Sequence, residues 1–301
     1  MTSTLILEQT FNGLQAGVTL FLVAAGLTLI LGIMDFVFLA HGAQVMIGAY
    51  FAAAITAASG NFYLGILLAI PLTFTSGYVL EFLVIRHLYR RDHMEQVLAT
   101  FGLILFFNEA IRVSFGPAAL FSDLPHSLSG FVEILPATPY PAYRLGVIIV
   151  GLLCAVGIHL LVSRTRIGAM VRAGANNPEM TAALGINIKT LFRLIFATGA
   201  CLAGVAGMML GPLTAVQSGM GEPLLILSLV VIIIGGIGSV RGAFVAAIIV
   251  GLVDTLGRGF LPSILRLFVE QATADGAGPA LASMLVYILM AVVLIFRPTG
   301  L

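Results

Sequence analysis

Nine long apolar stretches follow one another along the 301 residues, and most contain only a few polar side chains. A helix needs about 20 apolar residues to cross the hydrocarbon core of a bilayer. The candidate spans are residues 11–33, 41–59, 62–85, 96–113, 143–163, 191–213, 224–239, 242–257 and 281–297. With 60% hydrophobic and 9% charged residues, the chain has too few charges to cover such helices in water. The sequence therefore predicts an all-α membrane protein, a polytopic bundle of about 8–10 transmembrane helices in a single domain over residues 1–301.

Composition also limits the alternatives. A soluble leucine-rich α-solenoid would need charged outer faces, which the chain lacks. The net charge of +1 gives no basic surface for a nucleic-acid partner. Cys154 and Cys201 lie in apolar runs, which favours packed side chains over a disulfide or a metal pair. Residues 1–4 lack the basic region of a signal peptide, so we expect the first apolar stretch to be retained as a spanning helix.

The distribution of arginine predicts how the chain crosses the membrane, because cytoplasmic loops carry an excess of Lys and Arg. Basic residues gather in the loop 86–95 and in the segment 164–193, which we place in the cytoplasm. The segment 116–142 is rich in proline and has no Lys or Arg, so it should lie outside. This order puts the N-terminus outside and the C-terminus in the cytoplasm. It also puts residues 258–280 outside, although they include Arg258 and Arg266.

The long segment 164–190 contains the signals of a short helix at residues 178–184. Asn177 is a suitable N-cap, Pro178 fits the first helical position, and Glu179 complements the helix dipole. Gly185 fits the left-handed position that follows a helix. We expect this helix to lie outside the membrane core. It is either a docking element for another protein or an amphipathic turn that rests on lipid headgroups.

A second unusual stretch contains four glycines within eight residues: Gly235, Gly236, Gly238 and Gly242. Inside a helix each costs about 1 kcal/mol relative to alanine. Such glycines either allow close helix packing or free backbone groups beside a pathway. They do not form a phosphate-binding loop, because the only lysine, Lys189, has no glycine-rich loop before it. The chain therefore has no Walker-type ATPase site, and ATP-driven work would need a separate ATPase subunit.

Few charged residues lie within or beside the spans: Asp35, Glu81, Glu109, Arg112 and Asp254. An ionisable group inside a membrane is a functional candidate by default. Glu109 and Arg112 are three residues apart, so we expect them to pair on one helix face. His41 follows a break in the apolar pattern and is either a pathway residue or a packed interior histidine. No cluster has metal-ligand spacing and no nucleophile has a plausible base, so we predict neither a metal site nor a catalytic site, and no cofactor.

A weak internal sequence similarity relates the two broken segments of the chain. The sequences Ala40-His41-Gly42-Ala43 and Val240-Arg241-Gly242-Ala243 each join an apolar run to a helix rich in small residues. Glycine-broken segments at corresponding positions of two halves can mark a transport site.

Many short stretches, taken in order, resemble one family of transport proteins. They are Phe11–Leu14 with Gly17, Gly26–Ile30, Gly32–Met34, Leu39–Gly42, Met46–Tyr50, Ala99–Leu103, Gly168–Arg172, Ala183–Asn187, Gly235–Ser239, Gly242–Ala243 and Phe296–Leu301. Their order and number make the match specific over nearly the whole chain. The chain resembles the LivH-type permeases of branched-chain amino-acid ABC importers.

The resemblance implies a non-enzymatic subunit that works by alternating access in the bacterial inner membrane. It implies as partners a second permease (LivM-like or identical), two ATP-binding cassette subunits that hold ATP and Mg²⁺, and a periplasmic solute-binding protein. It also makes the short helix a cytoplasmic coupling helix, with Asn177, Pro178, Glu179, Ala182, Ala183, Leu184 and Gly185. The two breaks become a candidate translocation pathway, with His41, Gly42, Gln44, Gly235, Gly236, Gly238 and Ser239.

Three departures from the family pattern bear on the substrate. After His41-Gly42 the family usually has an acidic residue, and here Ala43 follows. Arg241 stands where proline is common, and Asp35 is acidic in a stretch that is usually neutral. Similar proteins also carry urea, short amides and aromatic or other organic acids. The expected solute is therefore a branched-chain amino acid or a related small polar or organic-acid molecule.

Two other functions compete with this interpretation. An ion-coupled secondary transporter that works without an ATPase could use Asp35 and Asp254 as intramembrane carboxylates. That function leaves the capped helix at 178–184 unexplained. A membrane-embedded enzyme would need a cluster of catalytic side chains at one depth, and the sequence contains no such cluster.

Overall fold

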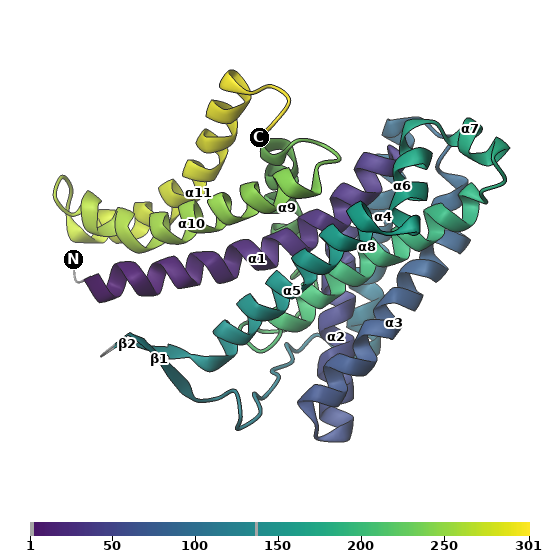
Figure 1. The fold of residues 1–301 in the computed structure, drawn as a ribbon. Helices are drawn as coiled ribbons and strands as arrows, with labels where there is room; N and C mark the ends of the chain where they lie inside the picture. Colours follow the sequence, from purple (N-terminus) through teal and green to yellow (C-terminus); the bar gives the residue numbers. More distant parts are fainter. Residues whose placement is uncertain (1–2, 136–137) are drawn as a thin grey trace.

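The computed structural model describes residues 3–135 and 138–301, and it is almost entirely helical (Figure 1). Within this part of the chain, eight helices are long and apolar enough to cross a membrane. They are α1 (Ser3–Met34), α2 (His41–Ser59), α3 (Phe62–Leu83), α4 (His93–Phe115), α5 (Ala142–Arg164), α8 (Ile188–Leu210), α10 (Val240–Leu265) and α11 (Gln271–Phe296). The shorter elements are η1 (Ile85–His87), β1 (Phe131–Leu135), β2 (Thr138–Pro141), α6 (Arg166–Asn176), α7 (Pro178–Ala183) and α9 (Glu222–Gly235). The prediction of an all-α polytopic membrane protein is confirmed.

Each of the nine predicted spans coincides with a helix, but several helices extend further than predicted. Helix α1 begins at Ser3 rather than at residue 11. The segment 258–280, predicted as an outer loop, is mostly helical because α10 continues to Leu265 and α11 begins at Gln271. Its two arginines are paired: Arg258 with Asp254 at 2.9 Å, and Arg266 with Asp275 at 2.7 Å. These ion pairs explain how a polar stretch remains helical where the sequence suggested a loop.

Two elements were not predicted from the sequence. Helix α6 precedes α7 in the segment 164–190, so that this segment contains two helices rather than one. The hydroxyl of Thr165 caps α6 by accepting a hydrogen bond from the amide of Gly168 at 3.1 Å. In the proline-rich segment, β1 and β2 pair antiparallel as a small hairpin.

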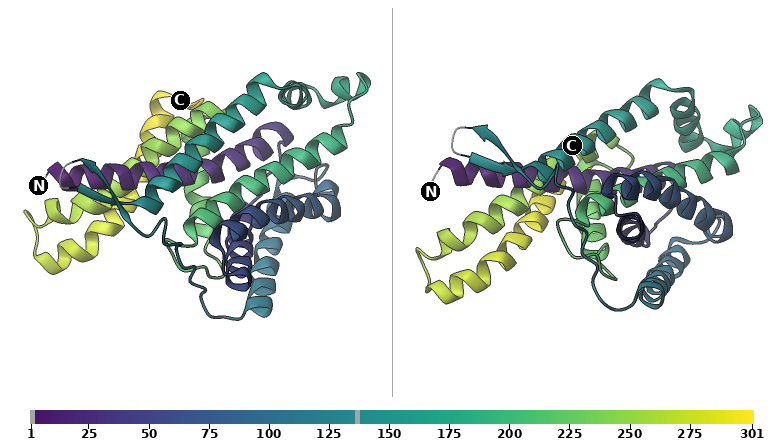
Figure 2. Two further views of the ribbon diagram at one scale, coloured as in Figure 1. Left: turned by 60° about the horizontal axis from the view of Figure 1, so that its bottom comes forward. Right: turned by 90° about the horizontal axis from the view of Figure 1, so that it is seen from below.

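Helix α1 runs through the centre of the molecule. In all three views the α10–α11 pair lies toward the N-terminal end of α1, and the group formed by α2, α3 and α4 lies toward its C-terminal end (Figures 1 and 2). Every residue of α1 from 17 to 30 is buried. Its 32 residues extend for about 48 Å, more than the ~30 Å of a hydrocarbon core. A helix of this length must tilt or project from the bilayer.

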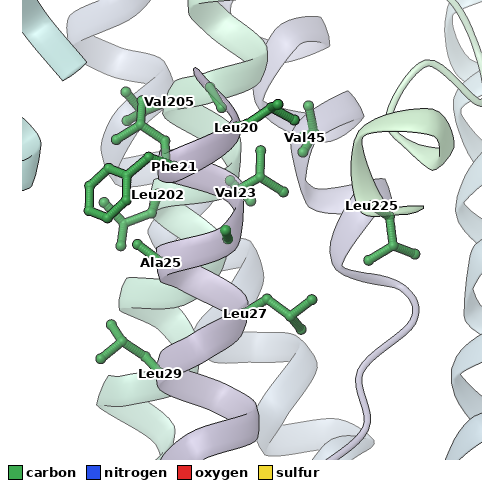
Figure 3. Close-up of a cluster of buried hydrophobic side chains, with 14 of the residues drawn as sticks. Leu20, Phe21, Val23, Ala25, Leu27, Leu29, Val45, Leu202, Val205 and Leu225 are labelled. Carbon is green, nitrogen blue, oxygen red and sulfur yellow. The ribbon is translucent and has the colours of Figure 1, made fainter. Parts of the chain in front are cut away.

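The core is built from apolar side chains that α1 shares with several other helices, among them α2 and α8. Figure 3 shows Leu20, Phe21 and Val23 of α1 close to Val45 of α2 and Leu202 of α8. Lipid is as apolar as leucine, so close packing rather than exclusion of water must hold such helices together. Helices α2 and α8 cross in contact because both have glycine at the crossing. A Cβ atom on Gly48 would lie 2.4 Å from the Cα of Gly204.

The break between α1 and α2 is an extended segment held by polar side chains of α4. Residues 35–40 are not helical, and Phe36 and Phe38 are fully or almost fully buried. The amide of Val37 donates to Oε1 of Gln96 at 3.2 Å, and the amide of Leu39 donates to Oγ1 of Thr100 at 3.4 Å. Gln96 and Thr100 are four residues apart and therefore lie on one face of α4. The break is thus a defined element with two of its amides paired to α4.

We predict that Gln96→Leu destabilises the fold by about 1–3 kcal/mol, because the amide of Val37 loses its acceptor inside the protein. Thermal unfolding of the purified chain in detergent measures the effect. Gln271→Leu is the matched control, since Gln271 is exposed at the start of α11. Equal unfolding temperatures for the two variants would contradict the assigned role of Gln96.

Candidate translocation and coupling sites

His41 lies deep in the protein at the first residue of α2. Its side chain is completely buried, and Nε2 is 3.1 Å from the carbonyl oxygen of Val23. Val23 is about 17 Å along α1 from Met34. The extended segment 35–40 therefore returns along α1, so that α2 begins part-way through the bundle rather than at its surface.

Helix α9 begins against the start of α2, and the residue before it, Gly221, is buried. The backbones of Gly42 and Gly221 are so close that a Cβ on Gly221 would lie only 1.9 Å from the carbonyl oxygen of Gly42. Residue 221 directly precedes α9, and residue 42 is in the first turn of α2. Two helix N-terminal ends, each carrying the positive end of a helix dipole, therefore meet within the bundle. Broken helices of this kind form solute sites in several transporter folds.

Gln44 is the third predicted pathway residue in this region. It is fully buried, and its Oε1 accepts a hydrogen bond from the hydroxyl of Ser76 at 3.3 Å. This contact joins α2 to α3. His41, Gly42 and Gln44 thus lie close together in the first turn of α2, and their side chains are enclosed by protein.

A polar group that sequence reasoning missed lies on the exposed side of this meeting point. Glu222, at the start of α9, is exposed, and its Oε1 accepts a hydrogen bond from Nδ2 of Asn108 at 2.6 Å. The hydroxyl of Ser218 donates to the backbone oxygen of Asn108 at 3.1 Å. The sequence did contain a signal, because Gly221-Glu222-Pro223 has the composition of a helix start.

The glycine-rich break between α9 and α10 lies near the opposite end of α9. Gly235 packs against the backbone of Gly242, where a Cβ would lie 2.6 Å from the carbonyl oxygen. The chain's last residues cover the break, since the amide of Leu301 donates to the carbonyl oxygen of Ile234 at 2.9 Å. Gly236 has a φ of 87°, which favours glycine. The buried glycines of this break serve close packing.

Gly238 and Ser239 line a cavity of about 480 Å³ near the C-terminal end of α1. The hydroxyl of Ser239 also caps α10 by accepting a hydrogen bond from the amide of Gly242 at 3.0 Å. The predicted pathway residues therefore form two separate groups rather than one. The similar residues 40–43 and 240–243 lie at the starts of α2 and α10, where Gly42 packs against Gly221 and Gly242 packs against Gly235.

The predicted short helix is present as α7. Oδ1 of Asn177 accepts a hydrogen bond from the amide of Met180 at 2.9 Å, and Gly185 has a φ of 86°, as expected for the residue that follows the helix. Met180 and Leu184 are 60% and 75% exposed. Figure 1 shows α7 at the edge of the molecule, attached through α6 and α8. This helix presents apolar side chains that nothing in the described chain covers.

Glu179 and Ala182 of α7 line a cavity of about 740 Å³ above the ends of α3 and α8. Its floor contains a buried ion pair between Glu81 and Arg193, with 2.8 Å between Oε2 and Nε. The hydroxyl of Tyr89 donates to the other carboxylate oxygen of Glu81 at 3.0 Å. Burial, together with the negative charge of Glu81, raises the pKa of Tyr89, so its hydroxyl stays protonated as the donor. The ion pair ties α3 firmly to α8 directly below α7.

The structure also shows the surroundings of the other charged residues that were singled out in the sequence. Glu109 and Arg112 are 4.0 Å apart on α4, as predicted. Asp254 is paired with Arg258, and Asp35 is exposed at the end of α1. Within residues 3–135 and 138–301, no group of three or more His, Cys, Asp or Glu side chains could hold a metal ion.

Comparison with known proteins identifies similar chains over almost the full length. A family profile described as "branched-chain amino acid transport system / permease component" matches residues 9–294. The high-affinity branched-chain amino acid transport system permease protein BraD of Pseudomonas aeruginosa is 29% identical over 98% of this chain and 94% of its own. LivH of Escherichia coli, with the same description, is 26% identical over the same shares. A probable LivH of Methanocaldococcus jannaschii is 26% identical over 84% of this chain and 85% of its own. No solved structure matches the chain significantly.

We predict that Gly221→Ala destabilises the bundle by about 1–3 kcal/mol, because the added methyl group would overlap the carbonyl oxygen of Gly42. The yield of monodisperse protein and its thermal unfolding temperature report the effect. Gly102→Ala is the matched control, since a Cβ there meets no atom within 4 Å. The close contact between α2 and α9 would be disproved by a Gly221→Ala protein as stable as the control.

Proposed function

Since the chain belongs to the family of permease components of branched-chain amino acid transport systems, we propose that it carries a branched-chain amino acid, or a related small polar or organic-acid solute, through the inner membrane. It is a multi-pass membrane permease, and its family works as ABC importers. The observation that carries the proposal is the family match over residues 9–294. The relatives named for branched-chain amino acids support that class of solute.

The proposed complex contains a second permease, LivM-like or identical, and two ATP-binding cassette subunits that bind ATP and Mg²⁺. A periplasmic binding protein delivers the solute. The absence of a Walker-type lysine loop from the sequence supports a separate ATPase. The exposed Met180 and Leu184 of α7 support a protein partner at that end of the molecule.

In the proposed orientation, α7 faces the cytoplasm with the C-terminus, and the N-terminus lies outside. The basic residues of the loop 86–95 and of the segment 164–193 favour this direction, because cytoplasmic loops are rich in arginine. The hairpin β1–β2 and the proline-rich segment around it then form part of the outer surface on which the binding protein docks.

Coupling would run from α7 to the spans through α8. In the proposal, ATP binding draws the ATPase subunits together and moves α7, which is held to the bundle only by its neighbours α6 and α8. The buried pair of Glu81 and Arg193 makes α3 and α8 move as one body. Separating the pair would leave the buried carboxylate of Glu81 without its counter-charge, so the pair survives the movement. Such rigid-body shifts between packed states are a common basis of switching.

The solute would pass the point where α2 and α9 begin. An amino acid carries both a carboxylate and an ammonium group. The two helix N-terminal ends favour the carboxylate, and the exposed carboxylate of Glu222 favours the ammonium group. Asn108 orients Glu222 through their 2.6 Å hydrogen bond. A secondary transporter would need a free intramembrane carboxylate, and the ion pair between Asp254 and Arg258 does not favour that alternative.

We predict that purification from the native membrane in mild detergent recovers an ATP-binding cassette protein and a second permease with this chain. Glu179→Arg and Gly185→Pro should keep this complex but lower the ratio of transport to ATP hydrolysis roughly tenfold or more. Glu179 faces a basic cavity where an arginine is repelled, and proline cannot adopt the positive φ of residue 185.

Glu8→Arg serves as the control for this experiment, because Glu8 is exposed near the start of α1, at the end of that helix far from α7 (Figure 1). Normal coupling in both α7 variants would contradict the coupling assignment. A chain that purifies alone and transports solute in liposomes without ATP would overturn the importer itself.

We also predict that Glu222→Gln lowers the uptake of an amino acid about tenfold to a hundredfold, because it removes a charged partner of the ammonium group. Uptake into liposomes containing the assembled complex measures the change. Glu109→Gln is the control, since Glu109 is also an exposed glutamate near the same part of α4. Equal uptake by the two variants would remove Glu222 from the pathway.

A further inference from the structure

An apolar groove and a polar cavity adjoin each other between α5 and α10, with α1 as their floor. The groove has a volume of about 300 Å³ and is lined mainly by Phe21, Leu152, Val156, Phe244 and Val245. The cavity is the 480 Å³ space that Gly238 and Ser239 line. His159, Val240 and Arg241 line both, so the two spaces adjoin at these side chains. Together they have the shape and polarity of an amphiphile's binding site.

The polar cavity is basic. Arg172 and Arg241 line it with His159, and none of its lining residues is acidic. The guanidinium of Arg172 donates to the carbonyl oxygen of Val162, while Arg241 forms no ion pair or side-chain hydrogen bond within residues 3–135 and 138–301. The cavity also borders the first turn of α10, whose dipole favours negative charge. These features select an anionic group.

Thr28 gives independent support for a ligand here. It lines the polar cavity and is 1% exposed, and its hydroxyl has no hydrogen-bond partner in the described part of the chain. A buried hydroxyl without a partner costs free energy. A small shift of the side chains that cover this hydroxyl would let an acceptor oxygen in the cavity reach it and remove that cost.

We propose that an anionic phospholipid binds in this site, with its phosphate between Arg172 and Arg241 and one acyl chain in the groove between α5 and α10. A free phosphate would leave the groove unfilled. An apolar helix of a partner would fill the groove but leave both arginines without a counter-charge. Anionic lipids are concentrated in the cytoplasmic leaflet, and basic pockets on that side bind their headgroups. Two predicted pathway residues, Gly238 and Ser239, line this cavity, but the solute site proposed above lies elsewhere, where α2 and α9 begin.

The test compares the retention of phosphatidylglycerol and phosphatidylcholine by the full chain, purified with its partners and analysed by native mass spectrometry. Two arginines should favour phosphatidylglycerol about thirtyfold. The double variant Arg172→Gln/Arg241→Gln should lose this preference. The control Arg164→Gln/Arg297→Gln should retain it, because neither arginine lines the cavity.

A second variant probes the groove without changing any charge. Val156→Trp should fill the groove and lower the retention of phosphatidylglycerol at least fivefold, whereas sn-glycerol 3-phosphate should not compete with the lipid. The proposal is overturned if the two double variants retain lipid equally or if Val156→Trp has no effect. It is also overturned if glycerol phosphate competes fully. A disulfide between Val245→Cys and a cysteine of the second permease would likewise overturn it, because protein rather than lipid would then cover the groove.

Discussion

Inside a bilayer no water is available to pair a backbone amide or carbonyl, so every departure from helix must be answered by another part of the protein. Two chain breaks, before α2 and after α9, would be untenable without such partners. The break before α2 is paired through Gln96 and Thr100, whose side chains replace the missing helical acceptors of Val37 and Leu39. The end of α9 is paired through the amide of Leu301. The arrangement of α4 and of the final residues follows from this requirement.

The same constraint explains the abundance of small residues. Helices in lipid gain stability from close packing, and the chain has 34 glycines. Gly48 meets Gly204 where α2 crosses α8, and Gly42 meets Gly221 where two helices begin. Side chains at these four positions would push apart the elements that define the centre of the bundle. Glycine at these positions lowers the intrinsic stability of the helices, and the close packing of their backbones offsets that loss.

Local signals predicted much of this structure, and long-range partners explain what was missed. A span is a property of about 20 consecutive residues, so the nine apolar stretches could be located from the sequence. The caps of α7 are likewise local, at Asn177 and Gly185. Nothing near Val37 in the chain indicates that Gln96 will accept its hydrogen bond, since 59 residues separate them. Glu222 was not predicted as a site residue for a similar reason. Its neighbours Asn108 and Gly42 are distant in the sequence and come close to it only in the folded chain.

The contact between Gly42 and Gly221 also has a consequence for the order of assembly. The two residues are about 180 positions apart, and a ribosome adds roughly 5–20 residues per second. The start of α2 therefore waits about ten to forty seconds after synthesis before α9 exists to cover it. During that interval the start of α2 lacks the backbone of Gly221 against which Gly42 packs in the finished fold. The interior of this fold is therefore completed late, when α9 packs against helices that were synthesised much earlier.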